Sequence, residues 1–256
     1  MIHRAAIVHD GAQIHETVEV GPFCVIGPHV KMGANCWVGA HAVIEGRTEM
    51  GEENRIFPFA SVGAIPQHLK YAGEPTVLRI GSRNSFREFV TINIGTVQGR
   101  SETLIGNGNT FMAYCHVAHD CIIEDSVIMS NAATLAGHVH VEKCAIIGGL
   151  VGVHQYCRIG QYAMIGGMSG VSLDIPPYTS SAGFRTKLYG LNTVGMKRHG
   201  FSPETIRNLK RAYKILFQSG ELLQAAAARV RAEVGGDAHV DHLVNFLLNS
   251  ERGFCR

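Results

Sequence analysis

The residues best suited to acid–base chemistry lie between positions 116 and 120, in the run His-Val-Ala-His-Asp. Imidazole is the side chain best matched to accepting a proton near neutral pH, and an adjacent carboxylate can fix its tautomer. We therefore predict that His119 and Asp120 form a functional pair. Clustered imidazoles can also bind zinc, so a metal site with His116, His119 and His138 as ligands stays open at this point.

These residues sit in a chain organised by a period of six. A large apolar residue, called a marker residue below, recurs at every sixth position with two interruptions. An apolar residue at every sixth position fits neither the 3.6-residue repeat of an amphipathic helix nor alternation at every second residue, so ordinary amphipathic helices and simple alternating strands are excluded. The period predicts a coil of short strands joined by corners, with the marker residues pointing inward. The marker residues are Ile2, Val8, Ile14, Val20, Ile26, Met32, Val38, Ile44, Met50, Ile56, Val62, Ile80, Phe86, Ile92, Ile105, Phe111, Val117, Ile123, Met129, Leu135, Val141, Ile147, Val153, Ile159, Ile165 and Val171.

Two further positions follow the same period. Glycine often comes directly after the marker residue, which we attribute to a corner that needs backbone freedom. The fourth residue after the marker is mostly small, and five of the seven cysteines occupy this place. We predict that these cysteines are buried small hydrophobic residues, free of disulfides and metal, as suits a reducing compartment.

The period converts sequence spacing into geometry. Three hexads make one triangular turn, so residues 18 apart should stack at the ~4.8 Å spacing of paired strands. Gly137 then lies beneath His119 and His138 beneath Asp120, and one turn further come Gln155 and Tyr156, next to His154. With Val117 inward, we expect His119 and Asp120 on the outer wall.

The two interruptions, residues 64–77 and about 98–101, read as outward loops. In the first, His68 and Glu74 occupy marker positions. Loops carried by a rigid scaffold are common places for binding residues, so both are candidates for substrate contact.

The carboxyl end differs in both pattern and charge. The period ends near Asp174, and we expect helices over residues 205–218, 221–234 and 238–249, the first capped by Ser202. We predict two domains, a β-helix over 1–183 and a helical domain over 184–256. The first carries 11 basic and 15 acidic residues, and the second 12 basic and 6 acidic, so the second should attract an acidic partner.

Composition excludes several classes of protein. An apolar content of 46% argues against disorder, and no apolar run approaches a membrane span. The excess of basic residues is too small for nucleic-acid binding, and aromatic residues are not interleaved with the basic ones. The amino terminus lacks the features of a signal peptide, so we expect a cytoplasmic protein.

Six segments resemble the UDP-N-acetylglucosamine O-acyltransferase family, which starts lipid A synthesis: residues 69–76, 91–99, 116–121, 131–139, 153–156 and 200–204. The resemblance implies a left-handed parallel β-helix and a homotrimer with active sites between subunits. It also implies transfer of an (R)-3-hydroxyacyl chain from acyl carrier protein to the 3-hydroxyl of UDP-N-acetylglucosamine. No metal, cofactor or covalent intermediate is expected.

Residue by residue, the resemblance implies that His119 is the general base, that Asp120 orients it, and that the Gly137 N–H stabilises the oxyanion. Gln67 and Lys70 would bind the nucleotide sugar, Gln155 the phosphopantetheine arm, and Asn192 and Arg198 the uridine diphosphate. The remaining positions that match substrate-site residues of the family are His116, Asn131, His138, His154 and Gly167.

Gly167, stacked above Gly149 and Asn131, matches a family position that limits acyl length, and its missing side chain predicts longer hydroxyacyl chains. The run from Arg185 to Lys214 carries eight basic residues against one Glu, a surface suited to acidic acyl carrier protein.

Asn93, Val194 and His199 depart from residues common in the family. The acceptor could therefore be a 3-amino sugar, which would give an amide. Three rival functions are a zinc hydratase of carbonic anhydrase type, the related N-acyltransferase and a non-catalytic scaffold. The N-acyltransferase family has an additional amino-terminal domain, whereas here the repeats begin at Ile2.

Overall fold

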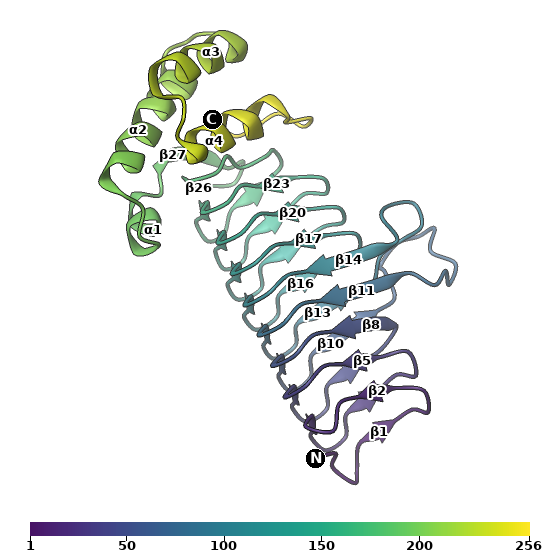
Figure 1. Cartoon of the computed structure of the whole chain (residues 1–256). Helices are drawn as coiled ribbons and strands as arrows, with labels where there is room; N and C mark the ends of the chain where they lie inside the picture. The colour runs from purple at the N-terminus through teal and green to yellow at the C-terminus, as the bar shows by residue number, and fades with distance from the viewer.

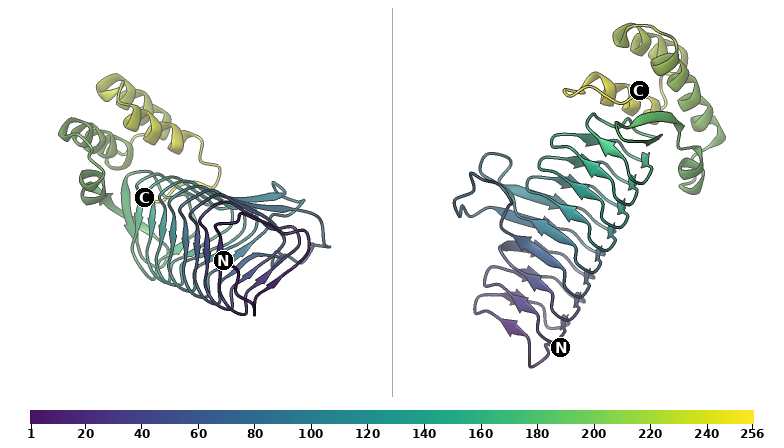
Figure 2. Two further views of the ribbon diagram at one scale, coloured as in Figure 1. Left: turned by 60° about the horizontal axis from the view of Figure 1, so that its bottom comes forward. Right: turned by 180° about the vertical axis from the view of Figure 1, so that it is seen from behind.

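The chain forms a long three-sided prism of stacked coils with helices at its carboxyl end (Figure 1). The computed structural model describes all 256 residues. Each coil contributes one short strand to each of three sheets, and a view from the end shows the coils superimposed around one interior (Figure 2). No helix is both long and apolar enough to cross a membrane.

The three sheets, named I, II and III in the order in which the chain enters them, run the length of the prism. Sheet I contains β1 (Ile7–Val8), β4 (Val25–Ile26), β7 (Val43–Ile44), β10 (Ser61–Ala64), β13 (Thr91–Asn93), β16 (His116–Val117), β19 (Thr134–Leu135), β22 (Gly152–Val153) and β25 (Gly170–Val171). Sheet II contains β2 (Gln13–Ile14), β5 (Lys31–Met32), β8 (Arg47–Met50), β11 (Val77–Ile80), β14 (Glu102–Ile105), β17 (Ile122–Ile123), β20 (His140–Val141) and β23 (Arg158–Ile159). Sheet III contains β3 (Glu19–Val20), β6 (Trp37–Val38), β9 (Arg55–Ile56), β12 (Ser85–Phe86), β15 (Thr110–Phe111), β18 (Ile128–Met129), β21 (Ile146–Ile147), β24 (Met164–Ile165), β26 (Thr179–Ala182) and β27 (Lys187–Leu191).

Strand register confirms the stacking expected from the period. His116 pairs with Thr134, and Thr134 with Gly152, each 18 residues further along. The spacing widens to 30 residues where Arg47 pairs with Val77 and to 25 where Val77 pairs with Glu102, and sheets I and III show the same two increases. The additional residues at these two places form the predicted loops, which project from one side of the prism near β11 and β14 (Figure 1).

The interior is a single apolar column built from the predicted positions. Forty-three buried residues form one cluster that includes most marker residues and the small residues between them. Cys115 and Cys121 are completely buried, and burial raises the pKa of the first thiol to about 11 and of the second to about 12. All seven cysteines are free thiols, so the expected absence of disulfides is confirmed.

Our explanation of the glycines after the marker residues is wrong in most coils. Positive φ occurs instead at the third residue after the marker, for example at Phe23, His41 and Asp120. The glycines are needed because the next coil passes very close. A Cβ at Gly148 would lie 2.6 Å from the backbone N of Gly167, a distance that no side chain tolerates.

The carboxyl end continues the coil further than predicted. Ile175 still bridges to Ile159, and β26 pairs in parallel with β24 before β27 turns back antiparallel. The Asp174–Pro177 segment reads as a stop signal in the sequence, but it stays within the coil, in a turn of 16 residues where the regular turns have 18. The predicted domain boundary after residue 183 falls in the turn between β26 and β27.

Three helices follow closely where the sequence placed them. They are α2 (Pro203–Gln218), α3 (Leu223–Val234) and α4 (Ala238–Leu248). The Ser202 side chain accepts a hydrogen bond from Thr205 N, as expected of an N-cap. The sequence analysis missed the short helix α1 (Thr193–Arg198), which Asn192 caps by accepting from Gly195 N.

Candidate active site

The His119–Asp120 pair lies at the corner between sheets I and II, directly after β16. His119 Nδ1 lies 2.8 Å from Asp120 Oδ2. Burial alone would raise the pKa of Asp120, but hydrogen bonds from Thr96, His119 and backbone N–H groups outweigh it and hold the pKa below its ordinary value. The carboxyl group is thus ionised and can only accept, so Nδ1 carries a proton and Nε2 is left as the basic atom.

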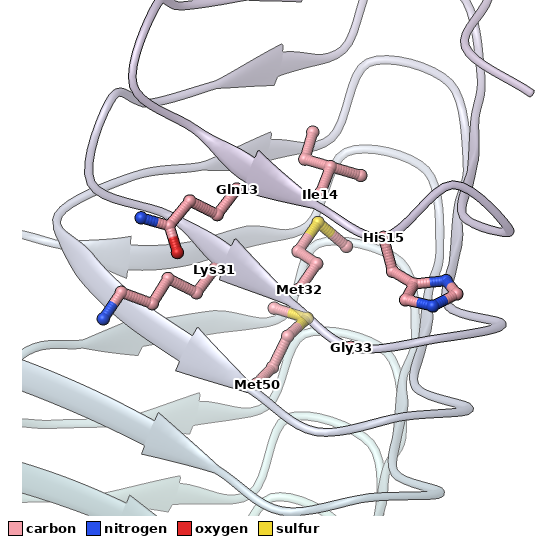
Figure 3. A pocket seen from close by; sticks show the side chains of 7 residues that line it. All are labelled: Gln13, Ile14, His15, Lys31, Met32, Gly33 and Met50. Carbon is pink, nitrogen blue, oxygen red and sulfur yellow. The ribbon is translucent and has the colours of Figure 1, made fainter.

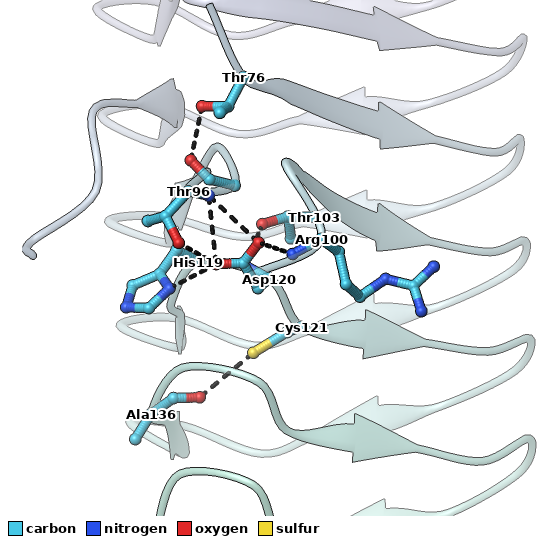
Figure 4. Close-up of polar contacts among 9 residues, drawn as sticks. Thr76, Thr96, Arg100, Thr103, His119, Asp120, Cys121 and Ala136 are labelled. Atoms are coloured by element: carbon cyan, nitrogen blue, oxygen red, sulfur yellow. Dashed lines mark hydrogen bonds and ion pairs between the residues drawn. The ribbon is translucent and has the colours of Figure 1, made fainter. Parts of the chain in front are cut away.

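The pair lies outside the apolar column, as expected of the outer wall, but it is covered from solvent. Only 8% of His119 and 1% of Asp120 is exposed to solvent. The segment between β13 and β14 folds over Asp120, and Thr96 N and Arg100 N both donate to its carboxylate (Figure 4). The six-residue period could not show this cover, because the covering segment is where the period is interrupted.

Gly137 lies beneath His119, as the stacking predicts. A Cβ at Gly137 would lie 2.6 Å from Cε1 of the His119 ring, so only glycine fits. The backbone N–H of Gly137 has no hydrogen-bond partner within the chain. The same place in other coils is taken by Pro22, Pro28 and Pro58, which have no N–H, so the fold does not need this donor.

Further imidazoles surround the pair. The His119 ring lies between the rings of His68 and His138, edge to face, with centroids 5.0 and 5.1 Å away. His116 Nδ1 lies 2.8 Å from the Thr91 hydroxyl. Burial lowers the pKa of both His116 and His138, so the two rings are neutral at physiological pH.

The zinc site suggested by spacing is not assembled as predicted. The ligand atoms that come within 4.8 Å of one another belong to His119, Asp120 and His138, and His116 is not among them. The Asp120 oxygens are already occupied by Thr96, Arg100 and His119. A cation at this point would have to displace those donors.

The predicted sugar-binding residues Gln67 and Lys70 are exposed on the first loop, the one that also carries His68 against His119. Asn93 donates to the Ile65 carbonyl and thereby holds the start of that loop. One turn beyond His138, His154 and Gln155 are exposed.

The proposed acyl-length position lies at another corner, between sheets III and I. Gly167 is exposed there, and a Cβ on it would come within 3.1 Å of the Gly149 carbonyl oxygen. A Cβ on Gly149 would in turn approach the Asn131 carbonyl oxygen at 3.3 Å. The predicted stack of Asn131, Gly149 and Gly167 is thus present.

One chain does not bring Asn192 and Arg198 to His119. Asn192 donates to the Tyr162 carbonyl at the corner between sheets II and III, and Arg198 is exposed at the end of α1. Of the departures from the family pattern, Val194 is exposed on α1, and the His199 ring packs edge-on against Tyr162.

Sequence reasoning missed two contributors to the site. His68 was noticed only as an interruption of the period, yet its Nδ1 is buried without a partner beside His119. Thr96 lies in the segment 91–99 that resembles the family, but the sequence analysis gave it no role. Both reach the site from segments outside the repeat, where stacking arithmetic does not apply.

Two hollows lie on the outer surface of sheet II. A cavity of about 590 Å³ adjoins the site through His138 and Tyr156 and extends to Arg158 and Arg252. A shallow hollow of about 400 Å³ lies over the amino-terminal coils (Figure 3) and contains none of the predicted site residues. The first hollow therefore belongs with the site and the second does not.

Comparison with known proteins agrees with this geometry. Residues 174–255 match the family model described as "Udp N-acetylglucosamine O-acyltransferase; Domain 2". A relative from Myxococcus xanthus is 53% identical over 211 residues, 82% of each chain, and one from Anaeromyxobacter sp. strain Fw109-5 is 51% identical over 213 residues, 83% of each chain. Both are named acyl-(acyl-carrier-protein)–UDP-N-acetylglucosamine O-acyltransferase.

Solved structures show the same fold along the whole chain. LpxA from Acinetobacter baumannii superimposes with a TM-score of 0.97 at 42% identity, covering 100% of this chain and 99% of that one. LpxA from Bacteroides fragilis also gives 0.97, at 41% identity and full coverage of both. The coil is a left-handed parallel β-helix, which confirms the expected fold class.

Proposed function

The chain belongs to the UDP-N-acetylglucosamine O-acyltransferase family, and from that membership we propose how its own residues carry out the reaction. It transfers an acyl chain from acyl carrier protein to UDP-N-acetylglucosamine in lipid A biosynthesis. We propose that the chain is an (R)-3-hydroxyacyl group and that it goes to the 3-hydroxyl of the sugar. Amide formation and zinc-dependent hydration find no support among the relatives.

His119 acts as the general base in this proposal. Its Nδ1 is held by Asp120, so Nε2 can remove the proton of the sugar hydroxyl while the oxygen attacks the thioester carbonyl. The tetrahedral intermediate then expels the phosphopantetheine sulfur, which takes the proton back from His119. The ester forms, the thioester breaks, and the base returns to its starting state.

Gly137 supplies the oxyanion donor in the same scheme. Its unpaired N–H lies beneath His119, and the fold has no other use for it. One such donor is worth about 10²–10³ in rate and a positioned base about 10²–10⁴. Both act on a thioester that is already activated.

We propose that the reaction uses neither a metal nor a cofactor. The donor set supports this, because the Asp120 carboxylate is already filled by protein donors. The same Asp120 hydrogen bond that would compete with a cation gives Nε2 of His119 its basic role.

We propose that the loop over residues 64–77 binds the acceptor. Gln67 and Lys70 provide an amide and a cation at its surface, and the unpartnered Nδ1 of His68 provides a polar atom beside the base. A buried polar atom without a partner is costly, and a sugar hydroxyl would satisfy it. His116, His138 and His154 extend this polar wall, and Gln155 lies where the donor arm would pass.

We propose that the working molecule is a homotrimer. A strip of rings runs along the corner between sheets III and I, with stacked centroids 4.9–5.2 Å apart. This aromatic corner, which is about half exposed, consists of Phe23, His41, Phe59, Phe89 and Tyr114.

The aromatic corner is extended by exposed Leu150 and Met168, whereas sheet II carries ion pairs such as Lys31–Glu49. A long apolar strip suits contact with further copies, and the charged face suits solvent. A neighbouring subunit would also supply the Asn192 and Arg198 that one chain keeps at a different corner.

Light scattering with size-exclusion chromatography tests the assembly. We expect three chains per particle for the native protein and a smaller particle for Phe59→Glu, because a charge would be buried in the contact. Lys31→Glu, on the charged face, is the control and should keep the native mass. A Phe59→Glu particle of unchanged mass would contradict the proposed contact.

We also propose that the protein works in the cytoplasm. All seven thiols are free, and a reducing compartment would keep them so. Labelling of intact cells with a membrane-impermeant thiol or amine reagent tests it, and labelling without lysis would argue against it.

The catalytic assignment rests on the His119–Asp120–Gly137 geometry. Acyl transfer from hydroxyacyl carrier protein to UDP-N-acetylglucosamine should fall at least about 10²-fold in kcat for His119→Ala. His9→Ala replaces an exposed histidine in the first coil and should match the native enzyme. A loss below about 10-fold in His119→Ala would reject the role of base.

A further inference from the structure

The segment between β13 and β14 makes closer contact with Asp120 than His119 does. Thr96 N lies 3.1 Å from both carboxylate oxygens, and the Thr96 hydroxyl donates to Oδ2 at 2.6 Å. Arg100 N donates to Oδ1 at 2.9 Å (Figure 4). With His119 at 2.8 Å, the carboxylate accepts from one imidazole and from three donors of this segment.

The segment is packed onto the carboxylate without any gap. Thr96 is fully buried, and a Cβ at Gly99 would lie 2.4 Å from Cγ of Asp120. The segment is itself anchored from the first loop, because the Thr76 hydroxyl donates to the Gly95 carbonyl. From the other side, Thr103 Oγ1 accepts from Asp120 N at 2.9 Å.

This arrangement fixes the direction of the Asp120 lone pairs. The φ of 61° at Asp120 belongs to its place in the repeat, whereas its side chain is held by the hydrogen bonds described above. A carboxylate with one free rotation about χ2 could turn away from His119. Arg100 N on Oδ1 and the Thr96 hydroxyl on Oδ2 remove that freedom and leave Oδ2 facing the imidazole.

We propose that Thr96 is a positioning residue for the acyl transfer, whose hydroxyl holds Asp120 in the orientation that keeps Nε2 of His119 basic and aimed at the acceptor. This rests on the proposed role of His119 as general base. Thr96 touches no substrate in this scheme and acts only through Asp120. Gly99 has the related role of leaving space for the carboxylate.

Thr96→Val removes the hydroxyl, keeps the shape and keeps the backbone donor. We expect kcat to fall by at least 10-fold, with KM for UDP-N-acetylglucosamine within about 2-fold of native. With Asp120 no longer held against Nδ1, the imidazolium of His119 is stabilised less, so the acid limb of the kcat/KM profile should move to lower pH. Thr96→Ser, which restores a hydroxyl, should recover most of the activity and the native profile.

Val97→Ala is the matched control, because Val97 is the next residue and half exposed, and its side chain makes no hydrogen bond to Asp120. It should keep the native kcat and pH profile. Thermal unfolding of each variant shows whether it folds. If Thr96→Val does not fold, Gly99→Ala takes its place, since its methyl group would displace the carboxylate and should give the same loss and the same shift.

A double-mutant cycle with Asp120→Asn tests whether Thr96 acts on the reaction through Asp120. If Thr96 acts through Asp120, adding Thr96→Val to Asp120→Asn costs little further activity. Additive losses, a Thr96→Val enzyme within 2-fold of native, or an unshifted pH profile would each overturn the proposal. An active His119→Ala enzyme would instead reject the assignment of the base, so the two failures are distinguishable.

Discussion

At the scale of single residues, the site depends on a missing side chain and a missing hydrogen-bond partner at Gly137. Gly137 has no side chain where the His119 ring lies, and its N–H is unpaired at a place in the repeat where other coils carry proline. The β-helix can thus leave the Gly137 N–H free without breaking a ladder hydrogen bond. The imidazole of His119 lies directly over this donor.

Gly137→Ala should therefore disable the enzyme while leaving it folded. The methyl group would lie 2.6 Å from Cε1 of His119, so the ring must tilt away from the reacting hydroxyl. We expect kcat to fall by about 10²-fold, the order of a positioned base. Gly152→Ala is the control, because nothing lies within 4 Å of its added Cβ. Steady-state kinetics and thermal melts give the answer, and a native kcat in Gly137→Ala would refute the packing argument.

Gly167 makes a separate prediction about the donor. Its exposed Cα lies above Gly149 and beside Leu150 and Met168. Because Gly167 has no side chain, the acyl chain of the donor could pass this point along an apolar surface. We expect the native enzyme to prefer long hydroxyacyl donors and Gly167→Met to prefer shorter ones. Each methylene kept out of an apolar site costs about 0.8 kcal/mol, so excluding four should cost about 10²-fold in kcat/KM. Competition between donors of different length measures this, and an unchanged preference in Gly167→Met would contradict it.

At the scale of elements, the sequence predicts the coil well and the loops poorly. The six-residue period places Gly137 under His119 because every residue between them belongs to the repeat. No such rule covers Thr96 or His68, whose segments leave the repeat and are positioned by long-range contacts such as Thr76 with Gly95. The same limit explains why the burial of Asp120 was missed, whereas α2 was predicted from its Ser202 cap.

Partly buried histidines on neighbouring coils and on α4 make stability depend on pH. Burial lowers the pKa of His116, His138 and His239, so each binds a proton more readily in the unfolded chain than in the folded one. The unfolded state then gains protons below about pH 6.5, and stability falls as the pH falls through that range. The stability that the three neutral histidines contribute to the folded state is fully present above the ordinary histidine pKa.

We expect the melting temperature to decrease steadily between pH 7.5 and pH 5.5, above the range in which carboxyl groups titrate. His138→Gln should flatten this decrease, and His9→Gln, which replaces an exposed histidine, should not. Calorimetry across this range provides the measurement. A melting temperature that is constant or rises on acidification would contradict the expected loss of stability at lower pH.

At the scale of the whole molecule, the prism has three different long surfaces. Sheet II is charged and carries the Arg79–Glu102 and Lys31–Glu49 pairs, whereas the aromatic corner on the opposite side is apolar. The helices at the carboxyl end (Figure 2) add a third surface, and the sequence that forms it has an excess of basic residues. A trimer that covers the aromatic corner would leave the charged sheet and the basic helices exposed to solvent and to partners.

The basic surface predicts how the donor protein arrives. Arg207, Lys210 and Lys214 lie at helical spacing on α2 and are exposed. Arg211, on the same helix, is paired with Glu233, so it contributes less free charge. Long-range attraction to an acidic protein raises the association rate and is screened by salt, with a Debye length of about 10 Å at 0.1 M.

We expect kcat/KM for acyl carrier protein to fall by roughly 10-fold between 0.05 and 0.5 M NaCl, with little change in kcat, because salt acts on encounter and not on the buried site. Lys210→Glu combined with Lys214→Glu should lower kcat/KM at low salt and weaken its salt dependence. Arg4→Glu makes a like change in charge at the far end of the prism and should have no effect on either. If the native enzyme is indifferent to salt, or if Arg4→Glu acts as strongly as the helix variant, the basic helices do not guide the donor.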